Sequence, residues 1–289
     1  MSSISPANLP ILNRLPTLAR MMRIVAHEAG EIAMASFRFG APTSARIWNK
    51  EGGSPVTEAD IAVDTFVKAR CAEALPEASW LSEETVDDPA RLASDLVWVV
   101  DPIDGTRAYM AGVPDWCVCI ALLSGNTPVL GIVHAPALNV AGSVQTSGAT
   151  YEALTGAGAT LNGKSLRATA GTIDQPRIAG PKPMLEALAL HMKLAPQPRV
   201  PSLALRLARV ADGSLDGGIV SPDSRDWDLA AADLIVQEAG GLVTSLDNAR
   251  LAYNRPRPVH ATLVVAGADL HPTLLAAARQ MRAKTFSRS

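Results

Sequence analysis

Apolar residues at three- and four-residue steps predict two helices near the start of the chain. The first is predicted to end between Phe37 and Gly40, with one apolar face formed by Leu18, Met21, Val25, Ala29 and Ile32. The second follows Thr57 and stops at Pro76, and its apolar residues have the same spacing: Val63, Phe66, Val67, Cys71 and Ala74. Both patterns are typical of helices that pack one face on a core.

Short continuous apolar runs predict buried strands in the middle of the chain. Residues 95–100 form such a run, which ends in the turn-forming pair Asp101-Pro102. Residues 117–123 and 129–133 form two more, and the turn-rich stretch between them predicts a hairpin in an antiparallel sheet. Residues 142–171, rich in Gly and Thr, are interpreted as strand ends and loops.

Helices and strands alternate in the last third of the chain. The pattern predicts helices at 184–192, 203–210, 229–239 and 272–283 and strands at 217–220, 242–245 and 262–266. Such alternation indicates an α/β fold, a sandwich of helical and sheet layers. The length, 289 residues, suggests two lobes, and a proline-rich stretch places the boundary near residue 175. The lobes are therefore 1–175, with most of the candidate metal ligands, and 176–289, with one ligand and the substrate-specificity segments.

Composition excludes several classes of protein. With 48% hydrophobic and 19% charged residues the chain has the composition of a globular protein, and a net charge of −2 argues against a nucleic-acid or anionic-membrane partner. Three cysteines are too few for a disulfide framework, and the Cys117-x-Cys119 pair lacks the partners of a zinc site in sequence, so all three are expected to be small apolar fillers. Neither a signal peptide nor a membrane span is recognised, which favours a cytoplasmic location.

Acidic residues collect at predicted strand ends and helix starts: Glu83, Glu84, Asp101, Asp104 and Asp228. Open α/β sheets place ligand sites at such positions. Carboxylates brought together repel one another unless divalent cations neutralise them, and hard oxygen ligands suit Mg²⁺, with Mn²⁺ as the alternative. The sequence therefore predicts a site for two or three metal ions and a small ligand.

The turn from Asp101 to Thr106 has the composition of a metal-binding turn. Pro102 fixes one backbone angle and Gly105 permits close approach, so Asp101, the Ile103 carbonyl and Asp104 can point one way. A helix starting after this turn would direct N–H groups of Gly105 and Thr106 towards the same pocket, where they could bind phosphate. Simpler interpretations stay open: Asp104 or Thr106 as a helix cap, Asp60 as part of a capping box with Thr57, and Asp228 as a partner of the helix dipole.

Three blocks of sequence resemble the inositol monophosphatase family of Mg²⁺-dependent, lithium-sensitive phosphatases. They are residues 81–85 (LSEET), 98–107 (WVVDPIDGTR) and 226–241 (DWDLAAADLIVQEAGG), with weaker likeness at 56–60 (VTEAD) and 264–267 (VVAG). The likeness spans about residues 18–282. It implies a layered αβαβα fold, a homodimer, and hydrolysis of a small phosphorylated metabolite by a metal-activated water.

The resemblance also implies roles for individual residues. Five residues match the family's metal ligands: Glu83, Asp101, the Ile103 carbonyl, Asp104 and Asp228. Glu83, Asp101 and Ile103 would hold a first Mg²⁺, and the three aspartates a second, with Glu83 near a third, weaker site. Asp60 and Thr106 would orient the attacking water, with Glu83 as a further catalytic residue.

Substrate preference is the open part of this interpretation. Family members hydrolyse inositol phosphates, adenosine 3′,5′-bisphosphate, histidinol phosphate or fructose bisphosphate. Ser221 stands where inositol-type members carry a glutamate, whereas Arg206, in the segment 201–206 (PSLALR), could bind a second phosphate. Gly105, Thr106 and Arg107 complete the predicted substrate contacts. An inositol phosphate phosphatase is the first hypothesis, a 3′(2′),5′-bisphosphate nucleotidase or histidinol phosphatase the alternative, and a non-catalytic phosphate-binding or metal-binding regulator the most remote.

Overall fold

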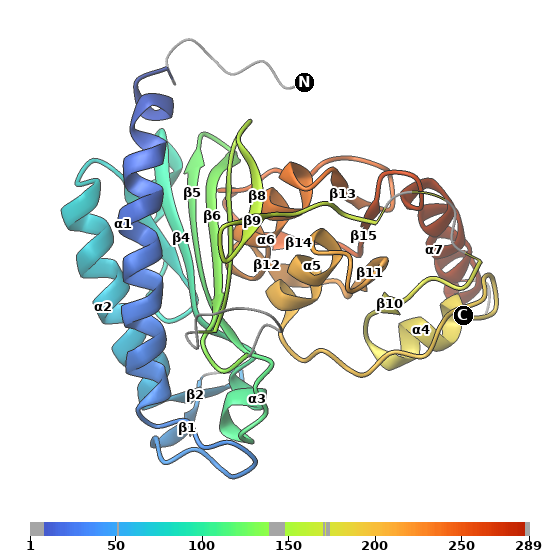
Figure 1. Cartoon of the computed structure of the whole chain (residues 1–289), viewed down its shortest axis with the longest axis horizontal. Helices are drawn as coiled ribbons and strands as arrows, with labels where there is room; N and C mark the ends of the chain where they lie inside the picture. The colour runs from blue at the N-terminus through green and yellow to red at the C-terminus, as the bar shows by residue number, and fades with distance from the viewer. Residues whose placement is uncertain (1–8, 51, 139–147, 170, 172–173, 287–289) are drawn as a thin grey trace.

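Five alternating layers of helices and sheets make up the computed structural model, which describes residues 9–50, 52–138, 148–169, 171 and 174–286 (Figure 1). From one outer face to the other the layers are: α1 (Leu9–Met34) with α2 (Glu58–Ala74); a seven-stranded sheet; α5 (Leu203–Ala211) with α6 (Asp226–Glu238); a four-stranded sheet; and α4 (Lys182–Leu188) with α7 (His271–Phe286). This arrangement confirms the predicted α/β fold class and its αβαβα layering.

The seven-stranded sheet follows chain order, and only its first pair of strands is parallel. Its strands are β3 (Ser79–Ser82), β4 (Leu96–Asp104), β5 (Cys117–Ser124), β6 (Thr127–Ala135), β7 (Ala149–Leu154), β8 (Gly158–Leu161) and β9 (Lys164–Ser165). The four-stranded sheet has the order β10 (Ile178–Ala179), β11 (Gly217–Val220), β15 (Leu263–Gly267), β13 (Gly241–Ser245). Two short pairs lie outside both sheets: β1 (Ile47–Asn49) with β2 (Pro55–Thr57), and β12 (Ser224–Arg225) with β14 (Val259–His260).

Strand β5 shows why the middle of the sheet has continuous apolar runs instead of alternating ones. Every residue of β5 is buried. Cys119 and Leu123 belong to the core that the sheet forms with α5 and α6, whereas Ile120 and Leu122 belong to the core under α1 and α2. A strand covered by helices on both faces has no solvent side, so no polar alternation is required.

Helix α1 starts earlier than the periodicity predicts. It begins at Leu9, passes through Pro16 and ends at Met34 instead of near Phe37. Pro16 is exposed, while Ile11 and Leu15 are buried and continue the apolar stripe towards Leu18, and this burial offsets the hydrogen bond that the proline removes. Although α1 has 26 residues, neither it nor any other helix in the ranges given above is long and apolar enough to cross a membrane.

The prediction of strand ends and loops for residues 142–171 is wrong in part. Strands β7, β8 and β9 lie within residues 149–165, while residues 142–147 of the same prediction are outside the described residues. These strands are short, and Gly and Thr occur in β7 and β8. The successive pairing of β6 with β7, β7 with β8 and β8 with β9 therefore defines them better than their own composition does. Helices α5 and α6 pack on both sheets. The two-lobe division at residue 175 stays a prediction.

Candidate active site

Strand β4 brings Asp101 and Asp104 to one end of the large sheet. Pairing with β5 is regular up to Asp101, which lies opposite Cys119, and then shifts so that Asp104 lies opposite Cys117. Pro102 cannot donate to the ladder, and such a shift is typical of a bulge that redirects side chains. The Ile103 N–H donates to Asp101 Oδ1 at 3.1 Å, which fixes this carboxylate within the turn.

Asp228 arrives from the start of helix α6. The helix begins at Asp226, three residues before the predicted start, and the Arg225 N–H donates to Asp228 Oδ2 at 2.6 Å in a capping arrangement. Asp226 holds this end in place, since its carboxylate accepts from the Asn254 N–H at 2.8 Å and lies 2.7 Å from His260 Nε2. The predicted dipole role of Asp228 is thus compatible with its place in the site, and the structure adds a capping role that was not predicted.

Asp101, Asp104 and Asp228 form an acidic cluster, which we call the aspartate trio. One ligand atom from each lies within 4.8 Å of those of the other two. Burial and then the charge of Asp104 raise the pKa of Asp228 to about 8, and burial together with Glu83 raises the pKa of Asp101 well above its ordinary range. Two oxygens on opposite sides of a Mg²⁺ ion are about 4.2 Å apart, so this cluster fits a divalent cation that replaces protons as the neutralising charge.

The start of helix α5 stabilises Asp104 by hydrogen bonds. Ser202, the N-cap of α5, donates its hydroxyl to Asp104 Oδ2 at 2.5 Å, and the Ala204 N–H donates to the same oxygen at 2.6 Å. Burial raises the pKa of Asp104, and these bonds oppose that rise. Ser202 is a residue that the sequence did not single out, although a serine before an apolar helical pattern is a recognisable cap.

Glu83, which lines the same pocket as the trio, and its neighbour Glu84 share a cation. Lys50 Nζ donates to Glu83 Oε1 at 2.8 Å and to Glu84 Oε1 at 2.7 Å. Burial lowers the pKa of Lys50, but the two glutamates outweigh burial and raise it. Burial raises the pKa of Glu84 to about 7. Lys50 was not predicted, because nothing in the spacing of a lone lysine in a glycine-rich loop indicates an acidic partner.

Asp60, in the first turn of helix α2, is hydrogen-bonded to Thr106. Asp60 forms the predicted capping box, since its Oδ2 accepts from the Thr57 N–H at 2.8 Å while Thr57 Oγ1 accepts from the Asp60 N–H at 3.4 Å. Its other oxygen, Oδ1, accepts from Thr106 Oγ1 at 3.4 Å. Burial raises the pKa of Asp60 to about 6, against the effect of its bonds to Thr57. The capping and the site interpretations of Asp60 are thus compatible.

A short helix, α3 (Thr106–Met110), follows the candidate metal-binding turn, and its N-cap is Gly105, so the prediction of Asp104 or Thr106 as the cap is wrong. Gly105 precedes it in the left-handed region, at φ 97°, and a Cβ at this position would lie 3.1 Å from the Asp115 carbonyl. The turn borders a pocket of about 240 Å³ whose lining includes Glu83, the aspartate trio, Ile103, Gly105, Thr106, Arg107 and Arg199.

The predicted substrate contacts fall into two groups. Arg107 lines this pocket, as does Arg199, which lies in a loop and was not predicted, since a lone arginine in a loop has no informative pattern. Neither arginine has a carboxylate partner in the described part of the chain. Arg206 is half-buried and donates to the Val200 carbonyl at 3.2 Å, and Ser221 is exposed at the end of β11; neither is among the residues that line the pocket.

Comparisons with known proteins agree with this geometry. The model of the inositol monophosphatase family matches residues 16–283. The chain is 31% identical to the 3′(2′),5′-bisphosphate nucleotidase CysQ of Aggregatibacter actinomycetemcomitans, over 80% of this chain and 85% of that protein, and 32% identical to inositol monophosphatase 2 of Solanum lycopersicum, over 76% and 85%. An inositol monophosphatase structure from Thermotoga maritima has the same fold, with a TM-score of 0.77 at 23% identity, covering 94% of this chain and 99% of that one. The chain therefore belongs to the inositol monophosphatase family and is a phosphatase that hydrolyses phosphate monoesters.

Proposed function

We propose that the protein is a Mg²⁺-dependent phosphatase acting on a small phosphate monoester of the inositol phosphate type. The observation that carries this proposal is the aspartate trio, two of its three members buried, at a pocket that also contains Glu83 and Ile103. Glu83, Asp101 and the Ile103 carbonyl would hold one ion, and the trio a second, with Mn²⁺ as a substitute. Bound Mg²⁺ would supply activation of water and neutralisation of charge on the phosphate and the leaving group.

The chain's own residues would position the water. Thr106 Oγ1 lies 3.1 Å from the Ile103 carbonyl and 3.4 Å from Asp60 Oδ1, so its one proton goes to one of these oxygens. The lone pairs of that hydroxyl are then free to accept a hydrogen bond from water. Asp60 in turn can accept the proton that Thr106 or water donates, with a pKa of about 6.

A second candidate, a 3′(2′),5′-bisphosphate nucleotidase, is favoured by Arg107 and Arg199. These guanidinium groups border the same pocket as the carboxylates. Two other basic side chains near the site are paired with carboxylates: Lys50 with Glu83 and Arg209 with Asp115. An arginine without a carboxylate partner suits a second phosphate on the substrate.

Phosphate release from a substrate panel tests both candidates. The panel consists of myo-inositol 1-phosphate, adenosine 3′,5′-bisphosphate, histidinol phosphate and fructose 1,6-bisphosphate, each with Mg²⁺ and with EDTA. Mg²⁺-dependent release is expected, with the largest kcat/KM for the inositol phosphate; the largest value for the nucleotide would favour the second candidate. Release that persists in EDTA, or none from any substrate by a folded protein, would contradict the proposal.

Arginine variants distinguish the two candidates. If the substrate has a second phosphate, Arg199→Ala is expected to raise KM for it by about tenfold or more, as the loss of a charged hydrogen bond predicts, and to leave kcat nearly unchanged. Arg20→Ala is the matched control, because Arg20 is exposed on α1 and its removal changes the net charge equally. Equal KM values in the Arg199→Ala and Arg20→Ala variants would exclude a role for Arg199 in binding that substrate.

A further inference from the structure

Two buried cysteines lie directly behind the aspartate trio. Cys117 and Cys119 are the cross-strand partners of Asp104 and Asp101, and both are at most 1% exposed. Their Sγ atoms are 3.6 Å apart, and Cys117 Sγ lies 3.9 Å from Asp104 Oδ2. Ligand atoms of these two cysteines and of Asp104 all lie within 4.8 Å of one another. The fold thus supplies the carboxylate partner that the Cys-x-Cys pair lacks in the sequence.

The distances match the geometry of a tetrahedral thiolate site. With metal–sulfur bonds of about 2.3 Å, two thiolates on one tetrahedral ion are about 3.8 Å apart. A thiolate and a carboxylate oxygen on the same ion are about 3.5 Å apart. The observed 3.6 Å between the sulfurs therefore needs almost no change, and Asp104 Oδ2 needs to approach Cys117 by only a few tenths of an ångström.

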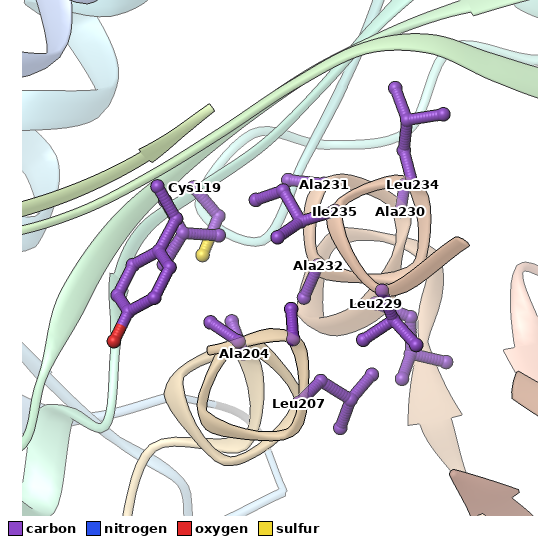
Figure 2. Packing of buried hydrophobic residues seen from close by; sticks show 14 of the residues in the cluster. Cys119, Ala204, Leu207, Leu229, Ala230, Ala231, Ala232, Leu234 and Ile235 are labelled. Atoms are coloured by element: carbon purple, nitrogen blue, oxygen red, sulfur yellow. The ribbon is translucent and has the colours of Figure 1, made fainter. Parts of the chain in front are cut away.

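The surroundings suit a soft metal ion better than Mg²⁺. Figure 2 shows Cys119 on its strand, facing the helices that carry Ala204 and Ala231, so apolar side chains enclose this side of the pair. Ser202 Oγ, 3.4 Å from Cys117 Sγ, is a further oxygen at this place. Asp104 also lines the pocket, so one of the three candidate ligands borders it. Thiolates select soft and borderline cations, whereas Mg²⁺ requires oxygen ligands.

We propose that Cys117, Cys119 and Asp104 form a separate site for a thiophilic divalent cation such as Zn²⁺ or Cd²⁺. Binding forms two metal–sulfur bonds and one metal–oxygen bond and releases the two thiol protons to solvent, with no change of oxidation state. Because Asp104 belongs to both sites, an ion held by the cysteines competes with Mg²⁺ for this carboxylate and inhibits hydrolysis. The inhibition rests on the proposed function; the binding itself does not.

A Cd²⁺ titration of the metal-free protein tests the binding. The protein is reduced with a phosphine, and the ultraviolet thiolate-to-cadmium charge-transfer absorbance is followed in wild type and in the Cys119→Ser and Cys71→Ser variants. Cys71 is the matched control, because it is equally buried and free but lies beside Met22 Sδ, at 3.6 Å, instead of Asp104. Wild type and Cys71→Ser are expected to bind one Cd²⁺ per chain. The Cys119→Ser variant should bind at least about tenfold more weakly, since even outer-shell changes cost metal sites that much.

The outcomes separate this site from the proposed function. The proposal is overturned if Cys119→Ser binds Cd²⁺ like wild type, or if folded wild type shows no charge-transfer absorbance. Cys119→Ala replaces Cys119→Ser if the serine variant does not fold. In the hydrolysis assay, Cd²⁺ should inhibit wild type at concentrations that leave Cys119→Ser active in Mg²⁺, and equal inhibition overturns the competition for Asp104. Absence of any Mg²⁺-dependent hydrolysis refutes the proposed function alone, since the absorbance still reports the thiolate site.

Discussion

Acid is expected to destabilise the fold through a buried histidine pair between helix α1 and the large sheet. His134 is 2% exposed, stacks on His27 with 4.3 Å between ring centroids, and shares a 2.9 Å hydrogen bond with Thr150 Oγ1. Burial, followed by the charge of His27, lowers the pKa of His134 from 6.5 to about 3. The unfolded chain therefore binds a proton below pH 6.5 that the folded chain does not bind until about pH 3. The stability that neutral His134 contributes is complete above pH 6.5 and is lost as the pH falls towards 3.

The magnitude follows from the two pKa values. When the pH falls from 7 to 5, proton binding by His134 favours the unfolded state, and the free energy of unfolding decreases by about 2 kcal/mol. Urea unfolding at pH 7, 6 and 5 measures this difference in wild type and in His134→Asn, which keeps a polar group near the Nδ1 position but does not titrate. Val133→Ala is the control, because it weakens the same strand without removing a proton site. An acid-induced loss in His134→Asn as large as in wild type would refute the reasoning.

Three further perturbations have defined outcomes. Asp228→Asn is expected to abolish hydrolysis and to raise the melting temperature of the metal-free protein, because it removes a carboxylate whose charge is disfavoured first by desolvation and then by Asp104. Mg²⁺ at 100 times its Kd should stabilise wild type by about 2.7 kcal/mol and the variant by less. Gly105→Ala and Gly125→Ala should each lower the free energy of unfolding by about 1–2 kcal/mol, because both glycines have positive φ. Only Gly105→Ala should impair hydrolysis, since a Cβ at Gly125 meets nothing within 4 Å. Arg91→Met should lower the free energy of unfolding in urea by about 1–3 kcal/mol, because buried Arg91 binds three partners. Arg70→Met, which breaks an exposed ion pair, should lower it by under about 1 kcal/mol.

Elements with a strong local pattern could be predicted from the sequence. Strand β11 has the predicted bounds, and the turn after Asp101 leads into a helix as expected. Strands β7 to β9 could not be predicted, because their residues resemble loop residues and only successive pairing from β6 through β7 and β8 to β9 makes them strands. The start of α1 was missed because Pro16 is a strong breaker signal, and only the burial of its neighbours shows that the helix continues.

The site could be predicted as far as position at element ends determines it. The aspartate trio comes together because β4 and α6 both deliver carboxylates to one end of the sheet, as the sequence indicated. Lys50 and Arg199 could not be predicted, since only the fold brings these loop residues to the pocket. The roles of Arg206 and Ser221, the homodimer and the cytoplasmic location stay predictions.

Backbone amides explain how a chain tolerates three carboxylates near one another, two of them buried. Each aspartate of the trio accepts at least one main-chain N–H: Asp101 from Ile103 at 3.1 Å, Asp104 from Ala204 at 2.6 Å and Asp228 from Arg225 at 2.6 Å. These bonds offset part of the desolvation cost and fix each carboxylate before any cation arrives. The carboxylates would therefore need little reorganisation to bind a divalent cation, and less of its binding free energy would be spent on ordering side chains. Because two of the three donors lie at the starts of helices α5 and α6, a change that shifts either helix start is expected to displace a carboxylate of the trio.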